Sequence, residues 1–297
     1  MTRLVSDNSL IPGILTRCVA ESTTENTPAI YNHIKTMPEP SIHPTSIVSP
    51  NAKLADGVAV GPYSIIHDHV EIGANTVIGP HVVIHDYVRM GAENRLHAHA
   101  VIGDLPQDIS FDISTETWVE LGDANIIREG VTIHRATAPS TSTRLGSGSY
   151  IMANTHIGHD CNIGNGVILS SVALGGHVEI GDKAVLGAST AIHQFCRIGQ
   201  YAMVAGFMPI RKDVMPYTMI AGDPARHYRL NTIGLRRSGI KGERYKVLEK
   251  AYRAVKSGDK SLQGIEDTAE VQSLREWLAQ DSKRGLSGFL GQSKNLD

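Results

Sequence analysis

The sequence predicts a mainly β protein: a parallel β-helix built from hexapeptide repeats, followed by a helical segment. Between residues 42 and 102 every sixth position is aliphatic. A period of six matches neither the roughly 3.6 residues of an α-helix nor the roughly 2 of an ordinary strand, and it is typical of a hexapeptide β-helix. The aliphatic positions are Ile42, Val48, Leu54, Val60, Ile66, Ile72, Ile78, Ile84, Met90, Leu96 and Ile102.

Each hexad is expected to supply one flat side and one corner of a triangular coil. The residue two before each aliphatic position is mostly small or β-branched, as in Ser64, Val70 and Thr76. Three sides make a coil of about 18 residues, and coils stacked roughly 4.8 Å apart bury the aliphatic column. Glycine often follows the aliphatic residue, and we expect it there to adopt a corner conformation that other residues resist. These glycines are Gly61, Gly73, Gly79, Gly91 and Gly103.

Two interruptions of the repeat predict insertions. The aliphatic ladder stops after Ile102 and restarts at Leu121, then stops after Ile133 and restarts at Leu145. Insertions around 104 to 119 and around 135 to 144 are therefore expected to leave the coils. Repeat proteins place such insertions on one face, which is often the binding face.

One step of the ladder is a residue short. Leu174 follows Leu169 after five residues, and the period of six then continues through Ile180 and Leu186. A tolerated local deletion explains this step, and a kink that re-aims the side chains near 170 to 177 is the alternative.

The two ends of the chain differ from the repeat. Residues 1–38 are rich in Ser and Thr and mix basic with acidic side chains. We expect a disordered N-terminal extension there, a β-helix domain over 39–222 and a helical domain over 223–297. Helical spacing supports the last of these, because Val247, Leu248, Ala251 and Val255 share one apolar face, and Leu274, Trp277 and Leu278 share another.

Composition excludes several classes of protein. The chain has 297 residues and a net charge of −2, so no basic excess indicates a nucleic-acid partner. It has no apolar run long enough for a membrane span and no compact secretory signal, which predicts a cytoplasmic location. Three cysteines are too few for a disulfide framework. Cys161 and Cys196 each stand two residues before a ladder Ile, so we interpret them as core residues.

Histidine is the most informative polar residue of the repeat. His177 follows His159 by eighteen residues, about one coil, so the two are expected at the same edge at neighbouring heights. Histidine titrates near neutrality and suits a general base that deprotonates a hydroxyl group. Asp160 directly follows His159 and is placed to orient its ring. A single histidine on a repeat face is more often just an exposed polar residue, but His156 and His193 enlarge this cluster.

Several motifs in a fixed order identify a family. In these motifs the chain resembles bacterial acyl-[acyl-carrier-protein]:UDP-N-acetylglucosamine O-acyltransferases. The motifs are THIGHDC at 155–161, LGGHVEIG around His177, AIHQFCRIG around His193, TIHR at 132–135, GDLPQD at 103–108, NTIGLRR and KRGL. The resemblance runs from about Ile42 to Leu290. It implies a left-handed parallel β-helix that forms a homotrimer, with the active site between subunits and with neither cofactor nor metal. It also implies transfer of a 3-hydroxyacyl chain from acyl carrier protein to the 3-hydroxyl of UDP-N-acetylglucosamine, the first step of lipid A biosynthesis.

The resemblance also implies roles for individual residues. His159 is the general base, Asp160 its orienting partner, and Gly176 donates a backbone N–H to the oxyanion of the reaction. Substrate-binding roles follow for Asp108 on the glucosamine ring, for His156, His177, His193 and Gln194 in the cleft, for Gly206 in the acyl groove, and for Asn231 and Arg237 at the nucleotide.

Three positions depart from the family pattern. Ser110 replaces a usual lysine, Ile233 a usual glutamate and Ser238 a usual arginine, so we expect rearranged contacts to the nucleotide. Basic residues between 236 and 253 resemble the surface on which the acidic carrier protein docks, although a solvated helix face accounts for the same charges.

Three other functions stay open. A related hexapeptide acyltransferase would act on another nucleotide sugar, which a product assay with both sugars would reveal. A trimeric zinc hydratase would bind metal through three histidines and lose activity on chelation. If the protein is a non-catalytic scaffold, the change His159→Ala would leave acyl transfer intact.

Overall fold

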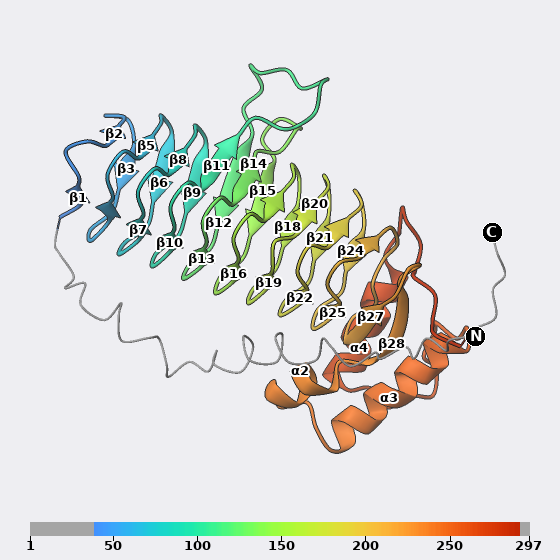
Figure 1. The fold of residues 1–297 in the computed structure, drawn as a ribbon. Helices are drawn as coiled ribbons and strands as arrows, with labels where there is room; N and C mark the ends of the chain where they lie inside the picture. The colour runs from blue at the N-terminus through green and yellow to red at the C-terminus, as the bar shows by residue number, and fades with distance from the viewer. Residues whose placement is uncertain (1–38, 292–297) are drawn as a thin grey trace, which may run out of the picture. The chain divides into compact units, whose positions relative to one another are not determined.

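The computed structural model describes residues 39–291, and it contains the expected parallel β-helix (Figure 1). The N-terminal extension predicted for 1–38 lies outside the described residues. Short strands wind around a left-handed prism whose three sides are sheets of mostly parallel strands. The helices α2 (Thr232–Arg237), α3 (Glu243–Lys256) and α4 (Ala269–Ala279) follow at its C-terminal end. None of the described helices is long and apolar enough to cross a membrane.

The strands of each sheet come from successive coils. The first sheet contains β1 (Ser41–Ile42), β4 (Ala59–Val60), β7 (Val77–Ile78), β10 (Arg95–Leu96), β13 (Ile126–Ile127), β16 (Tyr150–Ile151), β19 (Ile168–Leu169), β22 (Val185–Leu186), β25 (Met203–Val204), β27 (Thr218–Ala221) and β28 (Arg226–Leu230). The second contains β2 (Ile47–Val48), β5 (Ile65–Ile66), β8 (Val83–Ile84), β11 (Val101–Asp104), β14 (Thr132–His134), β17 (His156–Ile157), β20 (Ala173–Leu174), β23 (Ala191–Ile192) and β26 (Pro209–Ile210). The third contains β3 (Lys53–Leu54), β6 (Val70–Ile72), β9 (Val88–Met90), β12 (Trp118–Leu121), β15 (Ser142–Leu145), β18 (Asn162–Ile163), β21 (Glu179–Ile180) and β24 (Arg197–Ile198).

The aliphatic ladder forms the core of the prism. Ile66 pairs with Ile84 and Ile84 with Ile102 in neighbouring coils, and all three are buried. Ile42 in the first coil is 46% exposed because no described coil covers it from below. The positions two before the ladder also point inward: Ser64, Thr76, Cys161 and Cys196 are fully buried, which confirms the core interpretation of the two cysteines. Burial raises the pKa of the Cys161 thiol to about 12 and that of Cys196 to about 11.

The predicted role of the corner glycines is wrong. Of the five, only Gly103 has a left-handed φ, and the left-handed corner positions are instead filled by residues three after the ladder, such as Tyr63 and His81. The glycines are needed because neighbouring coils approach closely. A β-carbon on Gly61 would stand 2.9 Å from the carbonyl carbon of Gly79 in the next coil. The sequence pattern was right, but its cause is packing between backbones.

Both insertions are confirmed. The first leaves the prism between β11 and β12, and the second between β14 and β15; Figure 1 shows the first extending well beyond the coils. The short step is a local deletion, because β17 pairs with β20 in regular register, His156 with Ala173 and Ile157 with Leu174. The missing residue is taken from the corner at 170–172, where Ser171 adopts a left-handed φ.

The helical segment has its own core. Leu235, Leu248 and Leu274, from three helices, are buried in one cluster. The apolar face predicted from Val247 to Val255 is confirmed, since all four of its residues are buried there. The boundary that we proposed between 222 and 223 falls in the turn between the antiparallel strands β27 and β28.

Candidate active site

His159 and Asp160 form a hydrogen-bonded pair at a corner of the prism. The Nδ1 of His159 lies 2.8 Å from Asp160 Oδ2, and the two side chains are only 15% and 11% exposed. An ionised carboxylate is an acceptor only, so Nδ1 carries a proton, and in the neutral imidazole Nε2 has the free lone pair. Asp160 sits at the left-handed corner position with φ 59°, which turns its carboxylate back toward its neighbour. The pair therefore has the arrangement of an oriented base.

Thr137, on the second insertion, holds the carboxylate. Its hydroxyl donates to Asp160 Oδ2 at 2.7 Å, and its backbone N–H lies 3.1 Å from Oδ1. Burial raises the pKa of Asp160, but hydrogen bonds from His159 and Thr137 outweigh burial, so the pKa lies below its usual value. The aspartate is thus kept ionised beside the imidazole. Sequence reasoning missed Thr137, because no spacing rule links an insertion to a coil residue 23 positions later.

Gly176 lies directly against the imidazole. A β-carbon built on Gly176 would stand 2.5 Å from His159 Nε2, closer than any real contact, so this position accommodates only glycine while the ring stays in place. Within residues 39–291 no acceptor is hydrogen-bonded to its backbone N–H. The N–H is therefore available to an oxygen atom bound next to the imidazole.

His177 lies beside the pair, as the spacing of one coil predicted. Its ring centroid is 5.3 Å from that of His159, and its Nε2 is 3.6 Å from Asp160 Oδ2. Its other side stacks on Phe195 at 4.6 Å, and the Lys283 ammonium lies 4.1 Å from the Phe195 ring centroid. Burial lowers the pKa of His177, and Asp160 opposes that change. Phe195 and Lys283 are further neighbours that sequence reasoning did not single out.

Asp108, on the first insertion, faces the same histidines. Ser110 donates to Asp108 through both its hydroxyl, at 2.7 Å, and its backbone N–H, at 2.9 Å. These hydrogen bonds lower the pKa of Asp108, and the charges of His159 and His177 lower it further. Ser110, which departs from the family pattern, thus serves as the local partner of the aspartate. The insertion brings a carboxylate toward the imidazoles from outside the coils.

His156 lies three residues before His159 on the same coil, in β17. Its Nδ1 is 2.9 Å from Thr132 Oγ1, and its ring centroid is 5.1 Å from that of His134. Burial lowers the pKa of His156. The buried His134 binds the carbonyl of Leu105 at 2.6 Å and so fixes the start of the first insertion. The place of His134 in the TIHR motif was the only feature of the sequence that could have indicated this contact with the first insertion.

The remaining predicted residues lie outside this cluster. The exposed His193 contacts the carbonyl of Gln194 through Nδ1, and Gly206 stands where a β-carbon would be 2.9 Å from Ala188 O. Asn231 and Arg237 are at the two ends of α2, which Figure 1 shows on the other side of the prism from the insertions. The Asn231 side chain is already engaged, since it caps α2 at Gly234 N and donates to Tyr201 O.

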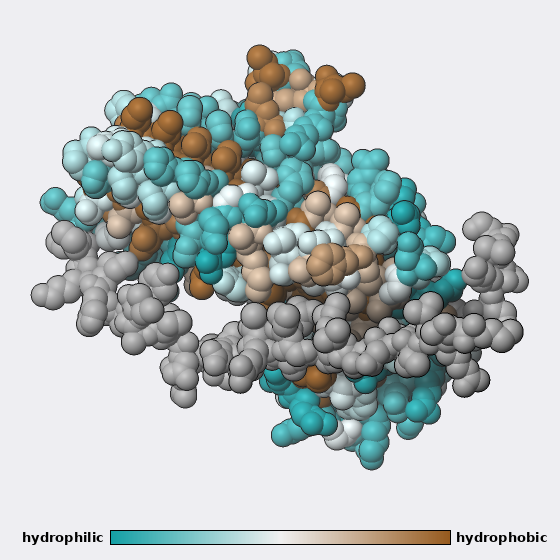
Figure 2. Space-filling model, viewed as in Figure 1, coloured by the Kyte–Doolittle hydropathy of each residue, from teal (hydrophilic) through white to brown (hydrophobic). Residues whose placement is uncertain are grey.

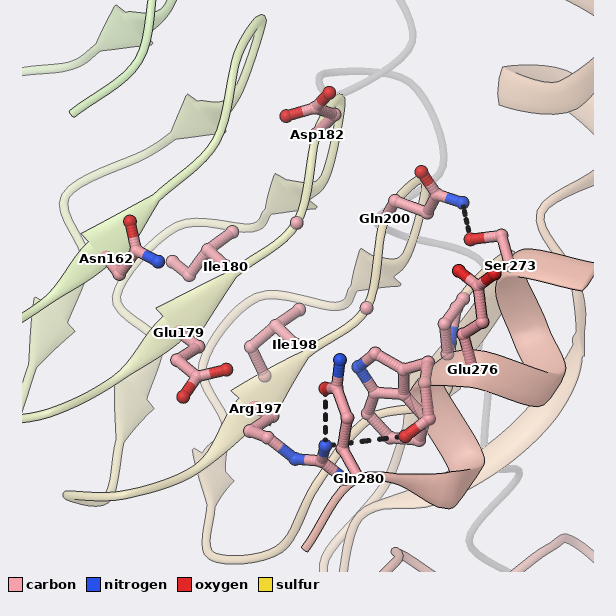
Figure 3. Close-up of a pocket in the computed structure, with 14 residues that line it drawn as sticks. Asn162, Glu179, Ile180, Asp182, Arg197, Ile198, Gln200, Ser273, Glu276 and Gln280 are labelled. Carbon is pink, nitrogen blue, oxygen red and sulfur yellow. Dashed lines mark hydrogen bonds between the residues drawn. The ribbon is translucent and has the colours of Figure 1, made fainter. Parts of the chain in front are cut away.

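A separate cavity of about 320 Å³ lies between the third sheet and α4 (Figure 3). None of the predicted site residues lines it. In Figure 3 the Arg197 guanidinium turns toward Gln280, to which it donates at 3.0 Å, and Gln200 reaches Ser273. These contacts join α4 to the coils, so we attribute a structural role to this region.

His159, Asp160 and His177 also satisfy a simple geometric test for metal binding. One ligand atom from each lies within 4.8 Å of the others. The zinc hydratase alternative would use three histidines, and this group contains two, His159 and His177. Asp160 Oδ2, however, already accepts hydrogen bonds from Thr137 and His159, and Nδ1 of His159 carries its proton toward that same oxygen. The arrangement suits proton transfer better than metal ligation.

Comparison with known proteins agrees with this geometry. A family model described as UDP N-acetylglucosamine O-acyltransferase, domain 2, matches residues 213–287. The acyl-[acyl-carrier-protein]--UDP-N-acetylglucosamine O-acyltransferase of Alkalilimnicola ehrlichii is 47% identical over 255 residues, which cover 82% of this chain and 98% of the relative. That of Thiobacillus denitrificans is 42% identical over 256 residues, covering 83% and 98%.

Solved structures extend the comparison to the fold. The UDP-N-acetylglucosamine acyltransferase of Bacteroides fragilis superposes with a TM-score of 0.78 at 32% identity, over 82% of this chain and 98% of that one. The Moraxella catarrhalis UDP-N-acetylglucosamine O-acyltransferase gives 0.77 at 38% identity, with the same coverage. This chain therefore belongs to the family of acyl-[acyl-carrier-protein]--UDP-N-acetylglucosamine O-acyltransferases.

Proposed function

We propose that the protein transfers a 3-hydroxyacyl chain from acyl carrier protein to the 3-hydroxyl of UDP-N-acetylglucosamine, the first step of lipid A biosynthesis. Membership of the family, together with the His159–Asp160 pair, carries this proposal. The same proposal includes the cytoplasmic location expected from the sequence. The proposed reaction requires a base for the sugar hydroxyl, a site for the oxyanion and binding surfaces for two substrates.

The reaction follows from the atoms around His159. The lone pair on Nε2 takes the proton of the 3-hydroxyl as its oxygen attacks the thioester carbonyl. The carbonyl oxygen becomes an oxyanion, which the Gly176 N–H stabilises where the charge develops. The intermediate then collapses, the carbon–sulfur bond breaks, and the imidazolium returns its proton to the departing thiolate. Asp160 stabilises the imidazolium throughout through its hydrogen bond to Nδ1.

We also propose a homotrimer, because the three outer faces of the prism differ. Outward residues of the third sheet alternate in charge and form ion pairs along it, from Lys53 and Glu71 to Arg89, Glu120 and Arg144. The first and second sheets are mostly apolar outside; Figure 2 shows the hydrophobic row along β2, β5 and β8. In a closed ring each protomer contacts two neighbours through two different faces. Two apolar faces and one charged face fit a ring around a three-fold axis.

The substrate contacts implied by the resemblance belong to this proposal. We assign Asp108, His156 and His177 to the sugar and the reacting groups, and His193, Gln194 and Gly206 to the acyl side. Asn231 and Arg237 are assigned to the nucleotide, which in a ring would come from the helical segment of a neighbouring subunit. For Asn231 this contact would have to replace part of its hydrogen bonding within α2.

Docking of the acidic carrier protein is proposed for the basic helical segment. Ion pairs already engage Arg244 with Glu270, Lys246 with Glu243 and Arg253 with Glu249. Within α2, α3 and the turn between them, the proposal therefore depends mainly on the exposed Arg236, Lys241 and Lys250. Their charge would steer the carrier toward the enzyme and make association sensitive to salt.

A product assay tests the proposed function. Purified protein is incubated with UDP-N-acetylglucosamine and 3-hydroxyacyl carrier proteins of several chain lengths, and products are identified by mass spectrometry. We expect one ester-linked acyl sugar, and we expect His159→Ala to abolish it while the oligomer stays intact. A matched reaction with a different nucleotide sugar tests the related acyltransferase. Absence of product with every donor would overturn the proposal.

A further inference from the structure

The second insertion, residues 135–141, is anchored at both ends to the base of the first. The backbone N–H of Arg135 donates to Asp104 O at 3.0 Å, and that of Ser140 to Glu116 O at 3.1 Å. Between these anchors the chain passes from the fully buried Ala136 to exposed residues, which leaves Thr137 half-buried beside Asp160. Thr137 thus occupies a fixed position, although its segment lies outside the coils.

Thr137 contacts both oxygens of one carboxylate. Its hydroxyl is 2.7 Å from Asp160 Oδ2, and its backbone N–H is 3.1 Å from Oδ1 and 3.2 Å from Oδ2. The same Oδ2 accepts the hydrogen bond of His159 at 2.8 Å and lies 3.6 Å from Nε2 of His177. The carboxylate therefore has two imidazoles within reach, and Thr137 alone binds both of its oxygen atoms among the side chains and backbone groups described.

We propose that Thr137 is a positioning residue for acyl transfer: it holds the Asp160 carboxylate against His159 Nδ1, so that Nε2 stays aimed at the acceptor hydroxyl. This inference rests on the proposed function, in which His159 is the base. Thr137 acts through Asp160. Without its hydroxyl the carboxylate keeps the backbone N–H, loses its shortest donor, and becomes free to turn toward His177.

Loss of the hydroxyl has two measurable consequences. A misoriented pair lowers kcat, and a hydrogen bond to an ionised group of this kind corresponds to a loss of roughly tenfold to a hundredfold. The carboxylate that turns toward His177 also moves away from His159 Nδ1 and stabilises the His159 imidazolium less. The acid limb of the kcat/KM profile therefore moves to lower pH. KM for both substrates stays near its original value.

The experiment compares Thr137→Val with Thr137→Ser, which keeps the hydroxyl. Thr143→Val is the matched control, because Thr143 is a buried threonine whose hydroxyl accepts the backbone N–H of Asp160 at 2.8 Å and does not touch the carboxylate. We expect Thr137→Val to lower kcat and displace the acid limb, Thr137→Ser to stay within about threefold of the original enzyme, and Thr143→Val to leave the limb in place. Thr137→Ala removes the same donor and carries the test if the valine variant does not fold.

A double-mutant cycle with Asp160→Asn completes the test. If Thr137 acts through the carboxylate, Thr137→Val costs little in the Asp160→Asn background. An unchanged kcat and acid limb in Thr137→Val would overturn the inference, and so would an equal loss in both backgrounds. His159→Ala separates the two proposals: an active His159→Ala enzyme contradicts the proposed function itself, whereas an inactive one beside an unaffected Thr137→Val contradicts only the role of Thr137.

Discussion

The imidazole of His159 occupies the space that a side chain on Gly176 would need, because a β-carbon there would be 2.5 Å from Nε2. The two residues belong to successive coils, and the backbone N–H of His177 donates to the carbonyl of His159 at 2.9 Å. The position of the proposed base thus depends on the absence of one atom in the coil above it.

Gly176→Ala should displace the His159 ring and leave the fold intact, because the clash involves a side chain. A displacement of about 1 Å at a reacting atom costs roughly a hundredfold in rate, and we expect a loss of kcat of that order. Gly288→Ala is the matched control, since its β-carbon would meet only the Arg226 side chain, at 2.7 Å, in the C-terminal segment. Steady-state kinetics and thermal unfolding of both variants check this. Equal activity of the two would contradict it.

The proposed trimer predicts that charge is tolerated on one outer face and not on another. Ile126 points outward from the first sheet and is 36% exposed, whereas Asn162 points outward from the third. Ile126→Lys should dissociate the oligomer and abolish acyl transfer, because it buries an unpaired ammonium between subunits. Asn162→Lys should leave both unchanged. Light scattering coupled to size-exclusion chromatography measures the mass, and a monomeric unmodified protein would refute the arrangement.

The ion pair between Arg197 and Asp213 should be far more important for stability than the surface pairs. Its Nε and Oδ2 are 2.9 Å apart, the side chains are 9% and 1% exposed, and Arg197 also lies over the Trp277 ring at 4.4 Å. Asp213→Ala leaves a buried guanidinium uncompensated, for which we expect a loss of about 3 to 5 kcal/mol. The exposed pair of Lys53 and Glu71 is the control, and Glu71→Ala should cost at most about 1 kcal/mol. Denaturant unfolding compares the two.

His227 should make stability depend on pH. It is buried, with Met215 N–H bound to Nε2 at 2.9 Å and its Nδ1 at 3.0 Å from Ser287 O, and burial lowers its pKa to about 4. Because the unfolded chain binds a proton near pH 6.5 and the folded chain does not, stability is complete above that value and falls as the pH drops toward 4. The loss reaches about 3 kcal/mol.

His227→Gln is the control for this titration, since glutamine can replace the hydrogen bonds without binding a proton. Urea unfolding at pH 7.5 and pH 4.5 should show a smaller difference for the variant than for the original protein. Identical differences would show that other groups, among them the half-buried His85 and His156, account for the whole effect.

Sequence periodicity predicted the prism because each aliphatic position pairs with the equivalent position in the adjacent coil, as Ile84 does with Ile66 and Ile102. The same rule placed His177 beside His159, and their ring centroids are indeed 5.3 Å apart. It failed for the corner glycines, because the distance between neighbouring backbones is a property of stacked coils and is not encoded in one hexad.

Residues outside the period could not be predicted in the same way. Thr137 lies in an insertion, so no spacing relates it to Asp160 and only the folded chain brings the two together. For Asn231 the prediction from the sequence was incomplete in a different way. The resemblance implied a nucleotide contact, while its place before Thr232 also makes it the cap of a helix, a role that the resemblance did not include.

Because the charges on the third sheet alternate from coil to coil, removing an even number of coils and removing an odd number have different effects on its ion pairs. Lys53, Glu71 and Arg89 follow one another coil by coil, so each ion pair joins neighbours of opposite sign. Excising one complete turn would set Lys53 against Arg89, two cations directly opposite each other, which is unfavourable. Excising two turns would restore an attractive match, here Lys53 against Glu120. The length of this rod should therefore be easier to change by even numbers of turns than by odd ones.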